Sequence, residues 1–131
     1  PEAISDFFLV EKMGTPPLAE LVVGLQQDAQ FGLTLTLGSG GILVEILGDS
    51  KTLLLPTDAS RIEAALKSLK VFSLLNGFRS QPKADIEAVS QTISRLCEYL
   101  QNAPKGFQEV EINPLFIYQN DVLAVDALVG H

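Results

Sequence analysis

The spacing of apolar residues changes twice along this chain, and this change constrains the fold more than any other feature. Before residue 56, apolar residues fall in short strand-like runs such as Leu21–Leu25 and the alternating Leu33–Leu37. From Thr57 to Leu100 they recur every three or four positions, which is typical of helices. Strand-like runs return after Phe107. The sequence therefore predicts a strand-rich first half, two helices and a terminal β-hairpin.

The first half holds further strand-like runs, separated by turns rich in glycine, proline and polar residues. The runs are Phe7–Val10, Ile42–Leu47 and Leu53–Leu55, and the turns are Gly14–Pro17, Gln26–Gln30, Gly38–Gly41 and Gly48–Ser50. These connections are shorter than the dozen or so residues that a parallel crossover needs, so we expect antiparallel pairing.

Each of the two expected helices has one apolar face and a recognisable start. The first should begin at an N-cap formed by Thr57 or Asp58 and end at Asn76-Gly77. The second should begin at Asp85 and end before Pro104. Their apolar stripes are Ile62, Ala65, Leu66 and Leu69, then Ile86, Val89, Ile93, Leu96 and Leu100. We therefore expect one α+β domain over residues 1–131, with two helices packed on one face of a mostly antiparallel β-sheet.

Composition and charge exclude several functions. The chain has 16 Asp and Glu against 9 Lys and Arg, and its net charge of −7 argues against nucleic-acid binding and against an anionic membrane surface. Its apolar runs are far shorter than the ~20 residues of a membrane-spanning helix. The single cysteine, Cys97, and the single histidine, His131, cannot form a disulfide, a zinc cluster or an internal catalytic imidazole. Cys97 is expected in the core, and the protein in the cytoplasm.

The terminal hairpin carries the best candidate for a metal site. Glu111 and Asn113 share one face of its first strand, because side chains alternate along a strand. With a two-residue turn at Gln119-Asn120, Asn113 pairs with Asp126; a shift of the turn makes them diagonal neighbours. Two carboxylates and an amide oxygen suit Mg²⁺. The alternative is that these residues form the solvated face of a half-exposed strand.

A glycine-rich segment, Gly38-Ser39-Gly40-Gly41, lies between two apolar runs. Glycines let the backbone approach phosphates and present N–H groups to them. The segment is not a Walker A loop, because no Gly-Lys-Ser/Thr follows it. A plain hairpin turn is the alternative interpretation.

Several short strings resemble the ATP-grasp domain of ADP-forming acyl-CoA synthetases. Glu111-Ile112-Asn113-Pro114-Leu115, followed by Ala124-Val125-Asp126-Ala127, resembles the end of such a domain. The closest family is the acetate–CoA ligase type, a relative of the succinyl-CoA synthetase β subunit. Further similar strings occur in the family's order: Phe8–Met13, Glu20–Gly24, Asp28–Gly32, Gly40–Glu45 and Leu75–Arg79. The resemblance implies the C-terminal subdomain of an ATP-grasp domain, with ATP or ADP and Mg²⁺ as its cofactors.

The resemblance also implies a role for each matching residue. Asn113 and Asp126 would be Mg²⁺ ligands beneath the nucleotide phosphates, with Glu111 nearby. The other implied contacts are to the nucleotide itself: adenine by the main chain of Glu11, Lys12 and Met13, ribose by Glu20, and the phosphates by Gly40 and Gly41. Two departures from the family pattern are Ala29, where proline is usual, and Ser80, where glycine often follows Arg79.

The resemblance covers one half of an ATP-grasp site, so its implied partners are the missing N-terminal ATP-grasp subdomain and the CoA-binding and ligase domains of the same enzyme. That enzyme would interconvert acyl-CoA, ADP and phosphate with the free acid, CoA and ATP through a phosphohistidine. The chain alone should be inactive, and apolar surface uncovered on it could produce a homo-oligomer. The alternatives are a non-catalytic ATP-grasp-like module of a fused protein acetyltransferase and a structural interaction domain.

Overall fold

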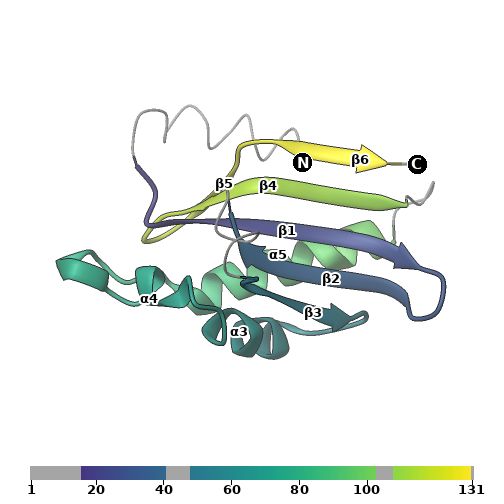
Figure 1. Cartoon of the computed structure of the whole chain (residues 1–131), viewed down its shortest axis with the longest axis horizontal. Coiled ribbons are helices and arrows are strands. Elements are labelled where there is room, and N and C mark those ends of the chain that lie inside the picture. Colours follow the sequence, from purple (N-terminus) through teal and green to yellow (C-terminus); the bar gives the residue numbers. More distant parts are fainter. Residues whose placement is uncertain (1–15, 41–47, 103–107, 131) are drawn as a thin grey trace.

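The computed structural model describes residues 16–40, 48–102 and 108–130. In this part of the chain, a six-stranded antiparallel sheet has the strand order β3-β2-β1-β4-β5, and β6 also pairs with β4 (Figure 1). The strands are β1 (Ala19–Asp28), β2 (Gly32–Ser39), β3 (Ser50–Leu54), β4 (Glu109–Ile117), β5 (Val122–Ala124) and β6 (Ala127–Gly130). The helices are α3 (Ala59–Lys67), α4 (Phe72–Leu75), the 3-10 turn η1 (Phe78–Ser80) and α5 (Ile86–Gln101).

The helices α3 and α5 contact each other and cover one face of the sheet, which confirms the predicted two-layer α+β architecture. Side chains that alternate along the strands, such as Leu21, Val23 and Leu25 of β1, are buried against these helices. We call the opposite side of the sheet the open face; it includes Glu20, Val22, Gly24 and Gln26 of β1 and the residues that pair with them. The described residues contain no helix that is long and apolar enough to cross a membrane.

The helix starts are as predicted, but the first helix ends early. The Asp58 side chain accepts a hydrogen bond from the Arg61 N–H at 2.9 Å, and Asp85 caps α5 in the same way. The prediction that the first helix runs to Asn76 is wrong, because α3 ends at Lys67. The N–H groups of Lys70 and Val71 donate to the carboxylate of Asp49, just before β3, instead of to helix carbonyls.

Two of the predicted turns are also corrected by the structure. β1 continues to Asp28, and its carboxylate accepts hydrogen bonds from the N–H groups of Gln30 and Phe31, so the turn begins only after residue 28. The glycine-rich segment is not a turn at its start, because Gly38 and Ser39 belong to β2. Polar residues can continue these strands because they lie on the open face or at the end of the sheet. The predicted runs Phe7–Val10 and Ile42–Leu47 lie outside the described residues.

Candidate functional site

The terminal hairpin has the register that a two-residue turn predicts. Ile117 pairs with Val122 and Ile112 pairs with Ala127, and the Tyr118 N–H donates to the Asp121 carbonyl at 2.9 Å. Asn113 therefore lies opposite Asp126, and its N–H donates to the Asp126 carbonyl at 3.0 Å. The predicted pairing of these two candidate ligands is confirmed.

A β-bulge in β4 sets which side chains reach the open face. Along β1, Leu21 pairs with Leu115 and Val23 pairs with Ile112, so Asn113 and Pro114 together face a single residue of β1. The extra residue lets Ile112 and Leu115 both face the helices, although they are three positions apart. Sequence analysis missed this bulge. Proline inside a strand is a signal that could have revealed it, because proline in a strand is confined to edges and bulges.

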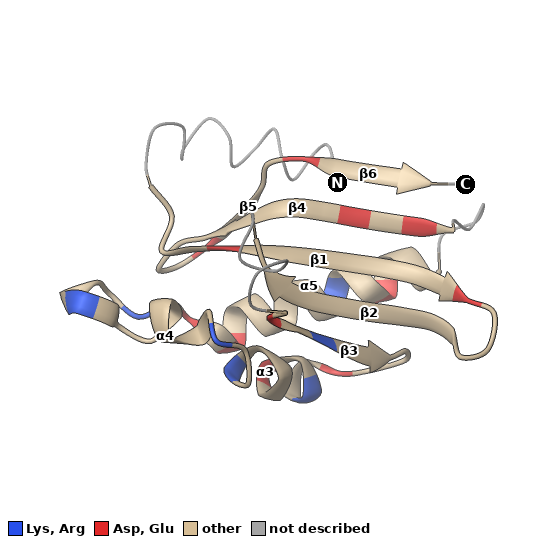
Figure 2. Ribbon diagram, viewed as in Figure 1, with Lys and Arg blue, Asp and Glu red and all other residues tan. Residues whose placement is uncertain are grey.

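The strand that pairs with β4 is interrupted at the same level. It divides into β5 and β6 at Val125-Asp126, where the Val125 N–H donates to the Pro114 carbonyl at 3.1 Å. One oxygen of the exposed Asp126 carboxylate accepts a hydrogen bond from the Ala127 N–H at 2.9 Å. Asn113 is also exposed and Glu111 is half-buried, and in the described part of the chain no hydrogen bond engages either side chain. Figure 2 shows the acidic segments of β4 and of the start of β6 in red.

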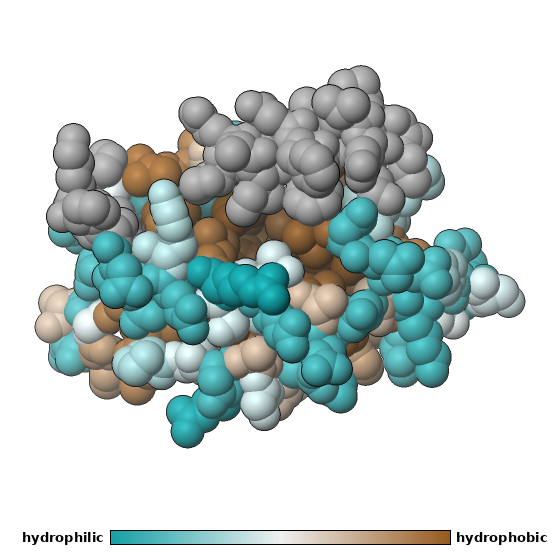
Figure 3. Space-filling view, turned by 180° about the vertical axis from the view of Figure 1, so that it is seen from behind, coloured by the Kyte–Doolittle hydropathy of each residue, from teal (hydrophilic) through white to brown (hydrophobic). Residues whose placement is uncertain are grey.

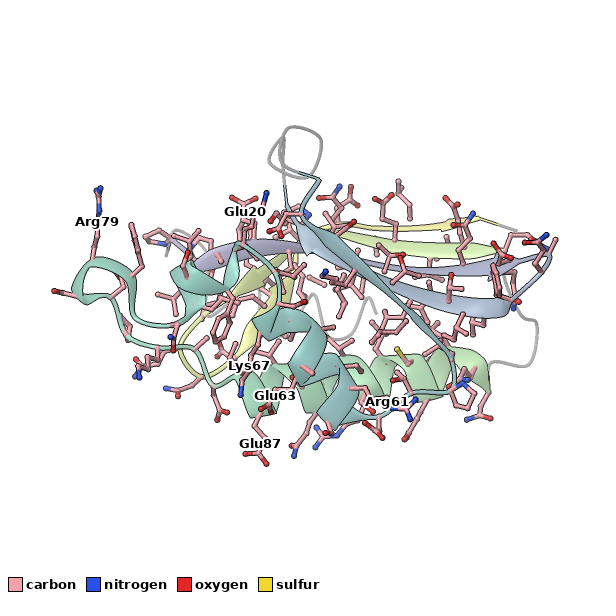
Figure 4. The ribbon with its side chains drawn as sticks, turned by 60° about the horizontal axis from the view of Figure 1, so that its bottom comes forward. Glu20, Arg61, Glu63, Lys67, Arg79 and Glu87 are labelled. Carbon is pink, nitrogen blue, oxygen red and sulfur yellow. The ribbon has the colours of Figure 1, made fainter. Side chains whose placement is uncertain are left out.

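Glu20 and Gly40 lie together farther along the open face. The Gly40 N–H donates to the Glu20 carbonyl at 2.8 Å, so residue 40 continues the β1–β2 register. A Cβ atom at Gly40 would lie 2.9 Å from the Glu20 Cβ, closer than two side chains can approach. Position 40 therefore requires glycine. The Glu20 side chain is exposed and projects away from α3 and α5 (Figure 4).

A shallow pocket of about 270 Å³ opens on the same face next to Glu111. It lies where Gly24 stands between Thr36 of β2 and Glu111 of β4. A Cβ at Gly24 would meet nothing closer than the Val110 carbonyl oxygen at 4.0 Å. The absence of a side chain at Gly24 therefore leaves room on the surface, although packing does not require glycine at this position.

The donor atoms of Glu111, Asn113 and Asp126 fit a hard divalent cation. All are oxygen atoms, with neither thiolate nor imidazole nearby in the described chain, and the described residues contain no cluster of three or more His, Cys, Asp and Glu. A site with two carboxylates and one amide is too sparse to enclose Ca²⁺, but Mg²⁺ is commonly held by one or two carboxylates together with water and phosphate oxygens. The implied adenine contacts Glu11, Lys12 and Met13, and Gly41, lie outside the described residues.

One buried carboxylate beside the site was not found by sequence analysis. Asp49 is 5% exposed and accepts hydrogen bonds from the Ser39 hydroxyl and from the N–H groups of Lys70 and Val71, at 2.7 and 2.9 Å for the two N–H groups. Burial alone would raise the pKa of this carboxyl, but the Ser39 hydroxyl and the two backbone donors outweigh it and hold the pKa below its ordinary value. Its position in Gly48-Asp49-Ser50 is typical of a turn, so the sequence contains no signal of this role.

The described residues form a two-layer α+β domain whose open face carries polar side chains along a bulged hairpin. The family model of the ATP-grasp domain matches residues 1–130. This chain belongs to the ATP-grasp family.

The relatives with similar sequences are CoA ligases. The chain is 34% identical over 108 residues to the acetate–CoA ligase (ADP-forming) I β subunit of Pyrococcus furiosus, a match that covers 82% of this chain and 46% of that subunit. It is 33% identical over 126 residues to a trans-feruloyl-CoA synthase from an unknown prokaryotic organism, covering 95% of this chain and 18% of that protein. The chain thus spans about half of the β subunit and a smaller part of the longer relative.

A solved structure with the same fold is an acetyl-coenzyme A synthetase from Ca. Korarchaeum cryptofilum. It superposes with a TM-score of 0.79 and 30% identity, covering 98% of this chain and 62% of that chain. That protein was solved with coenzyme A and Mg-AMPPCP, and its phosphohistidine segment points towards the nucleotide-binding site.

Proposed function

We propose that this chain is the nucleotide- and Mg²⁺-binding half of the ATP-grasp site of an ADP-forming acyl-CoA synthetase. The observation that carries the proposal is the placement of Asn113 opposite Asp126, on the same sheet face as Glu20 and Gly40. The similarity to ADP-forming acetate–CoA ligases supports it independently.

The order of residues along the open face supports one direction for the proposed nucleotide. Glu20 pairs with Phe116 at one end, where its exposed carboxylate can accept hydrogen bonds from ribose hydroxyls. Asn113 and Asp126 follow at the bulge, and Glu111 lies beyond them opposite Gly24. A bound Mg²⁺ would neutralise phosphate charge there. The nucleotide therefore runs along β1 with its phosphates over the bulge, and the Gly40 backbone flanks it.

The whole enzyme would convert acyl-CoA, ADP and phosphate into the free acid, CoA and ATP through a phosphohistidine carried by another domain. Its partners would be the other half of the ATP-grasp site and the CoA-binding and ligase domains, and we place the enzyme in the cytoplasm. The described residues supply positioning oxygens but no histidine, which is why we expect the isolated chain to bind nucleotide without turning it over.

A heteronuclear NMR titration of the 131-residue chain with Mg·ADP tests this proposal. We expect shifts at the amides of Gly40, Asn113 and Asp126, and an Asp126→Asn variant should weaken binding by about tenfold or more because a charged ligand is lost. Glu87→Gln is the matched control, because Glu87 is in the first turn of α5, on the covered side of the sheet (Figure 4). Shifts scattered over both faces, or equal affinities of the two variants, would contradict the proposal.

A further inference from the structure

Asp49 joins three parts of the fold at a single buried carboxylate. It comes just before β3, its main-chain carbonyl accepts the Ser39 N–H at 3.0 Å, and its side chain accepts the Ser39 hydroxyl. The same side chain accepts the N–H groups of Lys70 and Val71, in the segment between α3 and α4. The end of β2 is thus attached through one residue to the helical layer.

This attachment is rigid because the carboxylate is fully engaged. Three donors converge on its two oxygens, and the side chains of both Asp49 and Ser39 are buried, at 5% and 1% exposure. Hydrogen bonds to an ionised group are shorter and stronger than neutral ones, and a buried donor that loses its partner is costly. Ser39 therefore has little freedom to move while Asp49 is in place.

The next residue along the chain is Gly40, which touches the proposed nucleotide site. Its N–H donates to the Glu20 carbonyl at 2.8 Å, and the space beside it is too small for a Cβ atom. A displacement of Ser39 would move Gly40 relative to Glu20, because one peptide bond joins Ser39 to Gly40. The carboxylate on the covered side of the sheet is thus connected, through Ser39, to a contact on the open face.

We propose that Asp49 is a positioning residue of the nucleotide site, which fixes Ser39 and thereby holds Gly40 against Glu20. The inference rests on the proposed function. Asp49 itself does not touch the nucleotide, because its side chain bonds to the helical layer beneath the sheet. A structural role alone would stabilise the fold without changing the Gly40–Glu20 contact.

The test compares two variants of the 131-residue chain with the wild type. Asp49→Asn keeps the size of the side chain but replaces one acceptor oxygen with an amide N–H₂, which faces other donors. Ser39→Ala removes the hydroxyl donor with little change in packing. We expect each to raise the Kd for Mg·ADP, by about tenfold for Asp49→Asn. Hydrogen exchange at the Gly40 amide should become faster in both variants.

Asp58→Ala is the control, because Asp58 is also a carboxylate that accepts a backbone N–H, but at the exposed start of α3, and alanine removes this N-cap acceptor. It should lower the thermal midpoint of unfolding without changing the Kd or the Gly40 exchange rate. If the Asp49 and Ser39 variants bind Mg·ADP as the wild type does, the inference is overturned while the proposed function stands. If the wild type itself does not bind Mg·ADP, the proposed function fails and the inference with it.

Discussion

At the scale of single residues, burial and hydrogen bonding have opposite effects on the pKa of Asp49. Its pKa is held below the ordinary value of about 3.9, because three hydrogen-bond donors outweigh the cost of burial. A carboxyl whose pKa is lower in the folded state contributes stability above its unfolded pKa and loses it as the pH falls through the folded pKa.

We therefore expect Asp49→Asn to lower the free energy of unfolding by about 3 kcal/mol at pH 7. The difference from the wild type should shrink as the pH falls below about 4, because the unfolded wild-type chain then binds a proton that folded Asp49 takes up only at its lower pKa. Urea unfolding of both proteins between pH 2.5 and 7 measures this. A difference that stays constant over that range would mean that the charge of Asp49 is not what stabilises the fold.

Cys97 shows the opposite effect of burial on an ionisable group. Its thiol is 3% exposed on α5, and burial, with a smaller contribution from Glu98, raises its pKa to about 11. The prediction that Cys97 is a core residue is confirmed. At pH 8 we expect a thiol reagent such as DTNB to react only after the chain is unfolded in urea, since the thiolate is the reactive form. Rapid labelling of the native protein would contradict this.

At the scale of elements, the turn η1 carries avoidable strain. Arg79 and Ser80 have φ values of 50° and 66°, a region that favours glycine. Ser80 stands where the family pattern often has glycine. Ser80→Gly should raise the free energy of unfolding by about 0.5–1 kcal/mol, measured in urea. Gly77→Ser is the reverse control, because Gly77 has φ 83° and a Cβ there would lie 3.3 Å from the Lys83 Cγ. If the Ser80→Gly variant unfolds at the same urea concentration as the wild type, the turn is not strained.

The sequence predicts some elements of the site well and others poorly, for physical reasons. The pairing of Asn113 with Asp126 is predictable, because a short turn fixes the register of a hairpin. The contact of Gly40 with Glu20 depends on the β1–β2 register, and the sequence places that turn too early because Gln26 and Gln27 are polar although they lie in a strand. The partners of Asp49 are ten residues away, at Ser39, and more than twenty residues away, at Lys70 and Val71, so no local pattern reveals them.

At the scale of the whole molecule, the two faces of the sheet differ in chemistry. The open face carries the polar residues of the proposed nucleotide site. The covered face has an apolar groove of about 670 Å³ between α5 and the strands β4, β5 and β6, lined in part by Leu96, Tyr99 and Leu115. Seen from behind, apolar atoms are visible in a recess near the middle of the molecule, bordered by hydrophilic side chains (Figure 3). The helical layer therefore does not cover the sheet completely at the edge where β6 lies.

This incomplete cover leads to the expectation that the chain associates with itself. Tyr99 is 60% exposed at the groove, and within the described residues β6 pairs only with β4, so apolar surface and a strand edge lie together. Sedimentation velocity should show a weight-average mass that rises with protein concentration, and Tyr99→Lys should shift that rise to higher concentration. Phe31→Lys is the control, because Phe31 is as exposed, at 61%, but lies in the turn between β1 and β2. A wild-type mass that stays at one monomer up to millimolar concentration would show that the groove does not bind a second copy.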